Sequence, residues 1–196
     1  MRTPLALAAF ALLLGACQAA EQQRNDAAIM EGAANSFVNA VMPEPPVAAT
    51  EFPALTGRVV DNANLLSPAQ ETELVTVIEA LERRTTDQVV IVTVPSLGGR
   101  EIDAFGLALG RHWGIGQRGK DNGVLLIVAP NERKVRIEVG YGLEAILTNA
   151  RASEIIQQDI LPAFRREEFS QGISAGTHQI AATLLAAEDR PRRRQR

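Results

Sequence analysis

Cysteine, aromatic residues and net charge are all scarce in this sequence, and each shortage excludes a class of protein. One cysteine in 196 residues excludes an intramolecular disulfide and zinc sites built from cysteine pairs. Aromatic residues make up 4%, so a platform for stacking nucleic-acid bases is not expected. The formal net charge of −3 gives no attraction to nucleic acid either.

Length and overall composition indicate one globular domain with additional segments. A single domain usually has about 100–150 residues, and this chain has 196. Hydrophobic residues make up 46% and charged residues 22%, which is close to the average for a soluble protein. A fully disordered chain and a membrane protein with many spans are therefore excluded.

The first residues have the layout of an export signal. Met1–Thr3 carries a positive charge, and Leu5–Leu14 contains only leucine, alanine and phenylalanine. This run is too short to cross about 30 Å of hydrocarbon, which favours a secretory signal peptide. Its ending, Leu14–Cys17, resembles a bacterial lipoprotein signal, in which the cysteine receives a lipid. The alternative is an ordinary signal peptide with a cysteine nearby by chance.

The lipoprotein resemblance implies a location for the protein. Residues 1–16 would be removed, and Cys17 would carry a diacylglycerol group that anchors the chain to a membrane of the bacterial cell envelope. The protein would then face the periplasm. Gln18, in place of an aspartate, favours the outer over the inner membrane.

Residues 17–56 are expected to connect the anchor to the folded domain as a flexible linker. Pro43, Pro45 and Pro46 stiffen its second half. Apolar residues over 29–41 recur at helical spacing and indicate a short amphipathic helix. That helix has three alternatives: it lies on the membrane, docks on the domain, or forms only transiently.

The folded domain is expected over residues 57–187. Near-continuous apolar runs at 88–94 and 123–129 indicate strands that are covered on both faces. The alternation at 134–139 indicates a hairpin partner with one more exposed face. A short strand is expected at 58–60, and helices at 67–84, 102–113, 150–160 and 171–187. This order predicts an α/β fold, an α/β/α sandwich of three layers with a small mixed sheet.

The glycines of Gly114–Asp121 match a nucleotide-binding pattern only in their spacing. A phosphate loop needs a strand before its glycines and a helix after them, so that a helix N-terminus faces the phosphate. Here the predicted order is reversed. The segment is therefore interpreted as a loop.

Four separated segments together resemble the TPM domain family. They are Val60–Ser67, then Trp113–Gly116 with Lys120–Leu126, then Val139–Glu144, and Ile160–Phe164. The resemblance implies an exported α/β/α domain that is tethered to a membrane. Some relatives bind calcium or other divalent ions, acid phosphatase activity has been proposed for plant members, and others are linked to photosystem maintenance or to a membrane receptor.

The hairpin places candidate ligands together, because residues before its first strand and after its second meet at one end of the sheet. That end collects six polar residues: Lys120, Asp121, Asn122, Tyr141, Glu144 and Asn149. Carboxylate and amide oxygens suit Ca²⁺ or Mg²⁺, so the hypothesis is a divalent cation bound by Asp121, Glu144 and Asn149. The family often has aspartate at the position of Asn149. The alternative is a solvated polar loop.

Two further residues are open to two interpretations each. Asp61 either joins the same site, if its strand runs parallel to the strand at 88–94, or serves as a turn or cap residue before the Ser67 helix. Tyr141 either belongs to the site or is a half-buried packing residue between Gly140 and Gly142.

The last residues differ in charge from the domain. Residues 188–196 are expected to be disordered, and the arginines among them to be solvated or to contact anionic lipid.

The sequence as a whole favours a lipid-anchored accessory or interaction module that binds a divalent cation near a membrane and has a membrane-protein partner. The alternative is a metal-assisted phosphatase acting on a phosphomonoester, with Lys120 and a metal-bound water at its centre.

Overall fold

The computed structural model describes residues 52–189. The elements in chain order are β1 (Val59–Asp61), α2 (Pro68–Thr85), β2 (Gln88–Thr93), α3 (Ile102–Trp113), β3 (Gly123–Ala129), β4 (Lys134–Val139), the 3-10 turn η1 (Tyr141–Leu143), α4 (Asn149–Ile155), the π-helical η2 (Ile156–Ile160), α5 (Leu161–Phe164) and α6 (Phe169–Glu188). The expected signal peptide, Cys17, the linker up to residue 51 and the arginines from 190 onward lie outside the described residues.

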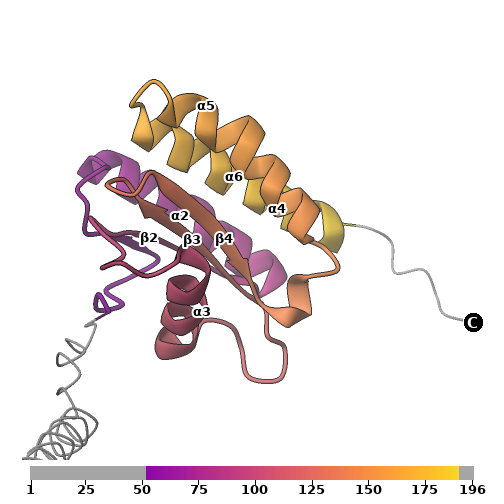
Figure 1. Cartoon of the computed structure of the whole chain (residues 1–196). Helices are drawn as coiled ribbons and strands as arrows, with labels where there is room; N and C mark the ends of the chain where they lie inside the picture. Colours follow the sequence, from indigo (N-terminus) through magenta and orange to yellow (C-terminus); the bar gives the residue numbers. More distant parts are fainter. Residues whose placement is uncertain (1–51, 190–196) are drawn as a thin grey trace, which may run out of the picture. The chain divides into compact units, whose positions relative to one another are not determined.

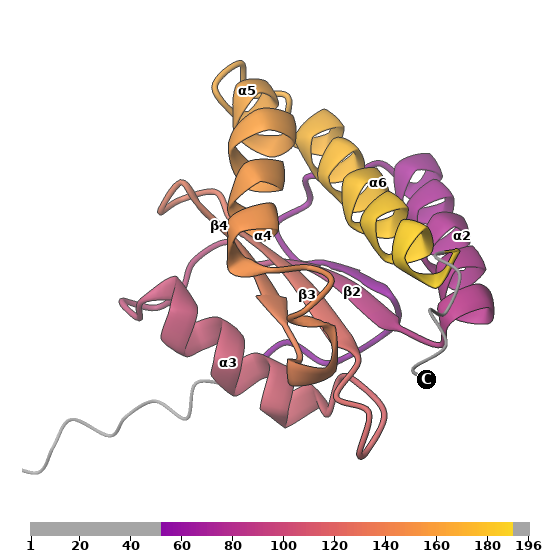
Figure 2. The same ribbon diagram turned by 90° about the vertical axis from the view of Figure 1, so that its right-hand side faces the viewer.

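The four strands form one mixed sheet in the order β1-β2-β3-β4. The first three strands are parallel, and β4 returns antiparallel to β3 as the expected hairpin. Helix α3 covers one face of the sheet, while α2, α4 and α6 cover the other (Figures 1 and 2). The predicted α/β/α sandwich is confirmed.

Each face of the sheet has its own hydrophobic core. Alternate residues of β3 point to opposite faces, so Leu126 packs under α2 and α6 while Leu125 and Ile127 pack under α3. Every residue of β3 is buried, as its continuous apolar run predicted. The two cores make the sheet a rigid layer whose ends can hold loops in fixed positions.

Helix α2 begins where its capping residues predicted. The side chain of Ser67 accepts from the backbone N–H of Gln70, and the side chain of Gln70 accepts from the backbone N–H of Ser67. Pro68 occupies the first turn, where its missing N–H costs nothing.

The expected helix over 150–160 is continued by a π turn into α5. Pro162 has no N–H to donate to the preceding turn, and its ring crowds that turn. The N–H of Leu161 instead reaches the carbonyl of Ile156, five residues earlier.

The folded part extends to Phe52, before the expected boundary at residue 57. The guanidinium of Arg100 lies 4.8 Å from the ring centre of Phe52 and 4.6 Å from that of Phe105, on α3. The indole of Trp113 donates to the carbonyl of Pro53 over 2.8 Å. Within residues 52–189, no helix combines the length and the hydropathy needed to cross a bilayer.

Candidate functional site

Two loops meet at the end of the sheet where β3 begins and β4 ends. The N–H of Gly140 donates to the carbonyl of Gly123 over 2.8 Å, and the N–H of Gly142 donates to the carbonyl of Asp121 over 3.1 Å. A Cβ on Gly142 would lie 1.9 Å from the carbonyl oxygen of Lys120, so only glycine permits this approach. The meeting of these segments, expected from the hairpin, is therefore found in the structure.

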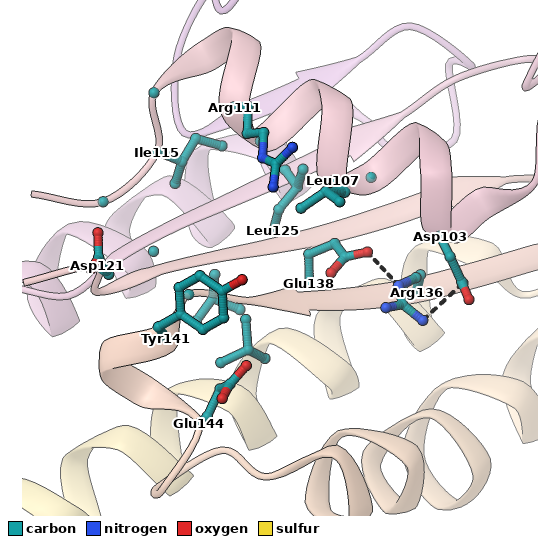
Figure 3. Close-up of a pocket in the computed structure, with 18 of the residues that line it drawn as sticks. Asp103, Leu107, Arg111, Ile115, Asp121, Leu125, Arg136, Glu138, Tyr141 and Glu144 are labelled. Carbon is teal, nitrogen blue, oxygen red and sulfur yellow. Dashed lines mark hydrogen bonds and ion pairs between the residues drawn. The ribbon is translucent and has the colours of Figure 1, made fainter.

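A groove of about 770 Å³ runs from this junction along α3 and β4 (Figure 3). Its walls come from α3, from the loop that follows α3, and from β4 and η1. Three charged residues along it are paired: Arg136 of β4 forms ion pairs with Asp103 of α3 and with Glu138 of β4. These contacts raise the pKa of Arg136 further, mainly through the hydrogen bond to Glu138.

Two carboxylates at the mouth of the groove are not neutralised in this way. Asp121 and Glu144 both line it, and neither forms an ion pair with another residue in 52–189. Figure 3 shows them on either side of Tyr141. Asp121 has a φ of 49°, a left-handed conformation that aspartate tolerates better than most residues. Its backbone is held there by the bond from Gly142.

Tyr141 is 78% exposed. This exposure contradicts the second of its two interpretations, that of a half-buried packing residue. Tyr141 instead lines the groove mouth between the two carboxylates.

The third expected ligand lies apart from the first two. Asn149 begins α4, is exposed, and is not among the groove-lining residues. Thr148 before it caps the helix by accepting from the N–H of Arg151 over 3.1 Å. Among residues 52–189, no group of three or more His, Cys, Asp or Glu side chains has the arrangement of a metal site.

Asn122 holds the loop in place, and Lys120 lies on the surface outside the groove. Asn122 is buried, where it donates to the carbonyl of Thr86 over 2.8 Å and accepts from the N–H of Gln117 over 2.8 Å. Lys120 extends to the hydroxyl of Thr86, 3.3 Å away. Neither residue lines the groove.

Asp87 is a buried carboxylate next to this polar cluster. Burial, the largest cause, raises its pKa above the usual value, and the charge of Glu188 acts in the same direction. Hydrogen bonds from Thr85 and Asn122 offset part of this effect. Sequence reasoning missed this residue, since nothing in the pattern distinguishes it from a turn residue between α2 and β2.

Asp61 does not share the end of the sheet with Asp121. β1 is parallel to β2, the condition under which Asp61 was expected to join the site, but that expectation is wrong. Because β1, β2 and β3 all run the same way, Asp61 at the C-terminus of β1 lies at the opposite end from Asp121, which precedes β3. Both oxygens of Asp61 are used: they accept from the N–H groups of Leu65 (3.1 Å) and Leu66 (2.8 Å), and from the hydroxyl of Thr93. This is the turn role, the second of its two interpretations.

Two glycine-containing sequence patterns do not lie in the structural context that their usual functions require. Gly114–Asp121 follows a helix and precedes a strand, as predicted, which is the wrong order for a phosphate loop. Gly172–Gly176 reads GxSxG, a pattern that sequence reasoning missed, but it lies inside α6 and not on the strand-to-helix turn that exposes a nucleophile. Its Ser174 carbonyl binds Nδ1 of His178 at 2.8 Å, so that nitrogen is not available as a base.

Comparison with known proteins identifies the architecture. A family model for the TPM domain matches residues 59–183. The N-terminal domain of a P. gingivalis protein is 36% identical, with a TM-score of 0.63, over 66% of this chain and 82% of that chain. No curated protein matches the chain.

Two further solved structures show the same fold at lower identity. The N-terminal domain of the cg2496 protein from Corynebacterium glutamicum is 17% identical, with a TM-score of 0.53, over 68% of this chain and 84% of that chain. The BA42 protein from Bizionia argentinensis is 17% identical, with a TM-score of 0.54, over 62% of this chain and 82% of that chain. At this identity the likeness concerns the fold alone.

Proposed function

The chain belongs to the TPM-domain family, and from this premise we propose that it is a lipid-anchored accessory module of the bacterial cell envelope that binds a divalent cation through Asp121 and Glu144. The observation that supports this proposal is the pair of carboxylates at the groove mouth. They come from two different loops, and neither forms an ion pair within residues 52–189.

The donor set favours a hard cation that is bound weakly. Carboxylate oxygens suit Ca²⁺ or Mg²⁺, and Asp121 and Glu144 are both exposed, so water can complete the coordination. A site with two carboxylates is expected to bind Ca²⁺ with a dissociation constant of about 0.1–1 mM, the range of extracellular calcium modules. Asn149 is not part of the proposed site, since it does not line the groove.

The groove lining favours an accessory role over catalysis. Within residues 52–189, the side chains that line it include no serine, threonine, cysteine or histidine. A covalent phosphoryl intermediate would have only the phenol of Tyr141 and the lining carboxylates available. Two of these carboxylates are paired with Arg136, and the other two are the proposed cation ligands. The alternative phosphatase would depend on a cation-activated water, with Asp121 and Glu144 as the residues that hold the cation.

Calorimetric titration tests the cation site. The unacylated chain from residue 18 onward is titrated with Ca²⁺, Mg²⁺ and Mn²⁺, and so is the double variant Asp121→Asn/Glu144→Gln. We expect weak binding to the parent and none to the double variant, while the control variant Glu79→Gln, an exposed carboxylate on α2, binds like the parent. Equal binding by parent and double variant would overturn the proposed site. Phosphomonoester turnover by the parent, lost in Asp121→Asn, would favour the phosphatase.

The membrane anchor has its own test. Replacement of Cys17 by serine removes the only thiol in the chain, and with it the proposed lipid attachment. The parent is expected in the membrane fraction of the producing cells and Cys17→Ser in the soluble fraction. Density separation of inner from outer membranes then tests the outer-membrane location favoured by Gln18. Membrane retention of Cys17→Ser would contradict lipid anchoring.

A further inference from the structure

The groove between α3 and β4 carries exposed apolar surface that the cation site does not use. The exposed large hydrophobic residues among residues 52–189 are Leu55, Leu107, Tyr141 and Ile146. Two of them, Leu107 at 49% and Tyr141 at 78%, line this one groove, and Figure 3 shows Leu107 above the buried Leu125. Grouped exposure of this kind in a concave surface is typical of a ligand or partner site.

Helix α3 touches the sheet at one glycine and leaves open space at another. At Gly106 the helix touches the sheet: a Cβ there would lie 2.6 Å from Cδ1 of Ile127 and 2.8 Å from Cγ of Glu138. One turn later, at Gly110, a Cβ would meet nothing within 4 Å. Gly110, Leu107 and Arg111 all line the groove.

β4 is the last strand of the sheet, and its outer edge is unpaired within the described part of the chain. The bond from the N–H of Gly140 to Gly123, together with the antiparallel register, fixes which peptide groups face β3. By alternation, the N–H and carbonyl groups of Ile137 and Val139 point away from β3. An extended peptide could therefore pair with this edge while its side chains enter the groove.

The charges along α3 favour an acidic residue in that peptide. Arg111 and Arg118 line the groove and form no ion pair among residues 52–189, whereas Arg136 has two carboxylate partners. Leu107 and Arg111 are four residues apart on the helix, about 6 Å along its axis. Side chains two residues apart on a strand are separated by about 6.6 Å and point to the same face. The spacing of Leu107 and Arg111 along the helix therefore matches the spacing of every second side chain along an extended peptide.

From this match we infer that the groove binds an extended segment of a partner protein, added to the edge of β4, with an apolar side chain against Leu107 and, two residues away, an aspartate or glutamate against Arg111. The segment required has the pattern apolar-x-acidic. This interaction uses neither Asp121 nor Glu144 as a ligand, so it goes beyond the proposed function and survives if cation binding fails.

Selection from random peptides tests the inference. A displayed library of random eight-residue peptides is panned, with EDTA present, on the full unacylated chain held by its N-terminus. We expect enrichment of the apolar-x-acidic pattern, and a loss in affinity of about tenfold or more in Arg111→Glu and in Leu107→Glu, by charge repulsion and desolvation. Both residues are exposed, so the variants keep the fold. Leu55→Glu, at an exposed leucine outside the groove, is the matched control and should bind like the parent.

Two measurements distinguish specific binding at this groove from nonspecific peptide binding. A peptide whose acidic residue is replaced by lysine should bind Arg111→Glu better than the parent, because the charges are exchanged. Amide hydrogen exchange at Val139 should slow in the complex, since its N–H pairs with the added strand. Failure to enrich any peptide, equal binding by the parent and both groove variants, or unchanged exchange at Val139 would overturn the inference.

Discussion

The two ends of the sheet each carry an aspartate beside a strand, and the two aspartates differ in what surrounds them. At the C-terminal end of β1, Asp61 accepts from two backbone N–H groups and one hydroxyl. At the other end, Asp121 offers an exposed carboxylate to the groove and has no ion-pair partner within residues 52–189. A carboxylate whose oxygens are all used holds a loop together, while one that is left free is available to a ligand.

Removing the Asp61 carboxylate, whose two oxygens both accept hydrogen bonds, should cause the largest loss of folding stability. Asp61→Ala leaves the N–H groups of Leu65 and Leu66 and the hydroxyl of Thr93 without their acceptor. We expect a loss of about 2–4 kcal/mol, the cost of leaving partly buried donors unpaired. Chemical denaturation measures the loss. Cation binding, measured where the variant is still folded, should be unchanged, and a lost cation site would contradict the separation of the two ends.

A larger residue at Gly142, where the two loops meet, should have the next largest effect. It should lower both the unfolding free energy and the affinity for Ca²⁺. In Gly142→Ala the new Cβ meets the carbonyl of Lys120 at 1.9 Å, so the loop that carries Asp121 must move. We expect a loss of about 1–3 kcal/mol in unfolding free energy, as for other overpacked sites, together with weaker Ca²⁺ binding. Denaturation and calorimetry on the same sample test this. Alanine at Gly110, where a Cβ meets nothing within 4 Å, is the control and should preserve both.

The smallest effect, and one that depends on pH, is expected at Asp87. Its raised pKa means that the folded state favours the protonated acid, so ionisation destabilises the fold. This penalty is absent below the unfolded pKa of 3.8 and grows as the pH rises through the higher folded value. Asp87→Asn should therefore gain stability relative to the parent between acid pH and neutrality. Melting temperatures at a series of pH values test this, and a constant difference would contradict it.

The sequence was sufficient for the elements whose signals are local. The capping residues Ser67 and Gln70 placed the start of α2, and the apolar runs of β2 and β3 predicted strands covered on both faces. The hairpin of β3 and β4 correctly brought Asp121 and Glu144 to one groove, because a hairpin fixes which residues meet.

The remaining features depend on contacts between distant segments. The direction of β1 follows from its pairing with β2, and the parallel direction places Asp61 at the C-terminal end of the strands, away from Asp121, which precedes β3. The exposure of Tyr141 and the close approaches of Gly142 to Lys120 and of Gly106 to Glu138 are found only in the folded structure. In the sequence each of these close approaches is marked only by a glycine. A glycine alone does not predict a close contact, because glycines also occur in turns and at helix ends.

Thermal unfolding with and without Ca²⁺ tests the contrast between the two aspartates most directly. The parent, Asp61→Asn and Asp121→Asn are compared in the same buffer, and saturation at about 20 times the dissociation constant should stabilise a binding protein by about 1.8 kcal/mol. The account predicts that Asp121→Asn melts like the parent without Ca²⁺ and gains nothing from it, while Asp61→Asn melts earlier and keeps the gain. A stabilised Asp121→Asn, or an Asp61→Asn that melts like the parent, would contradict the account.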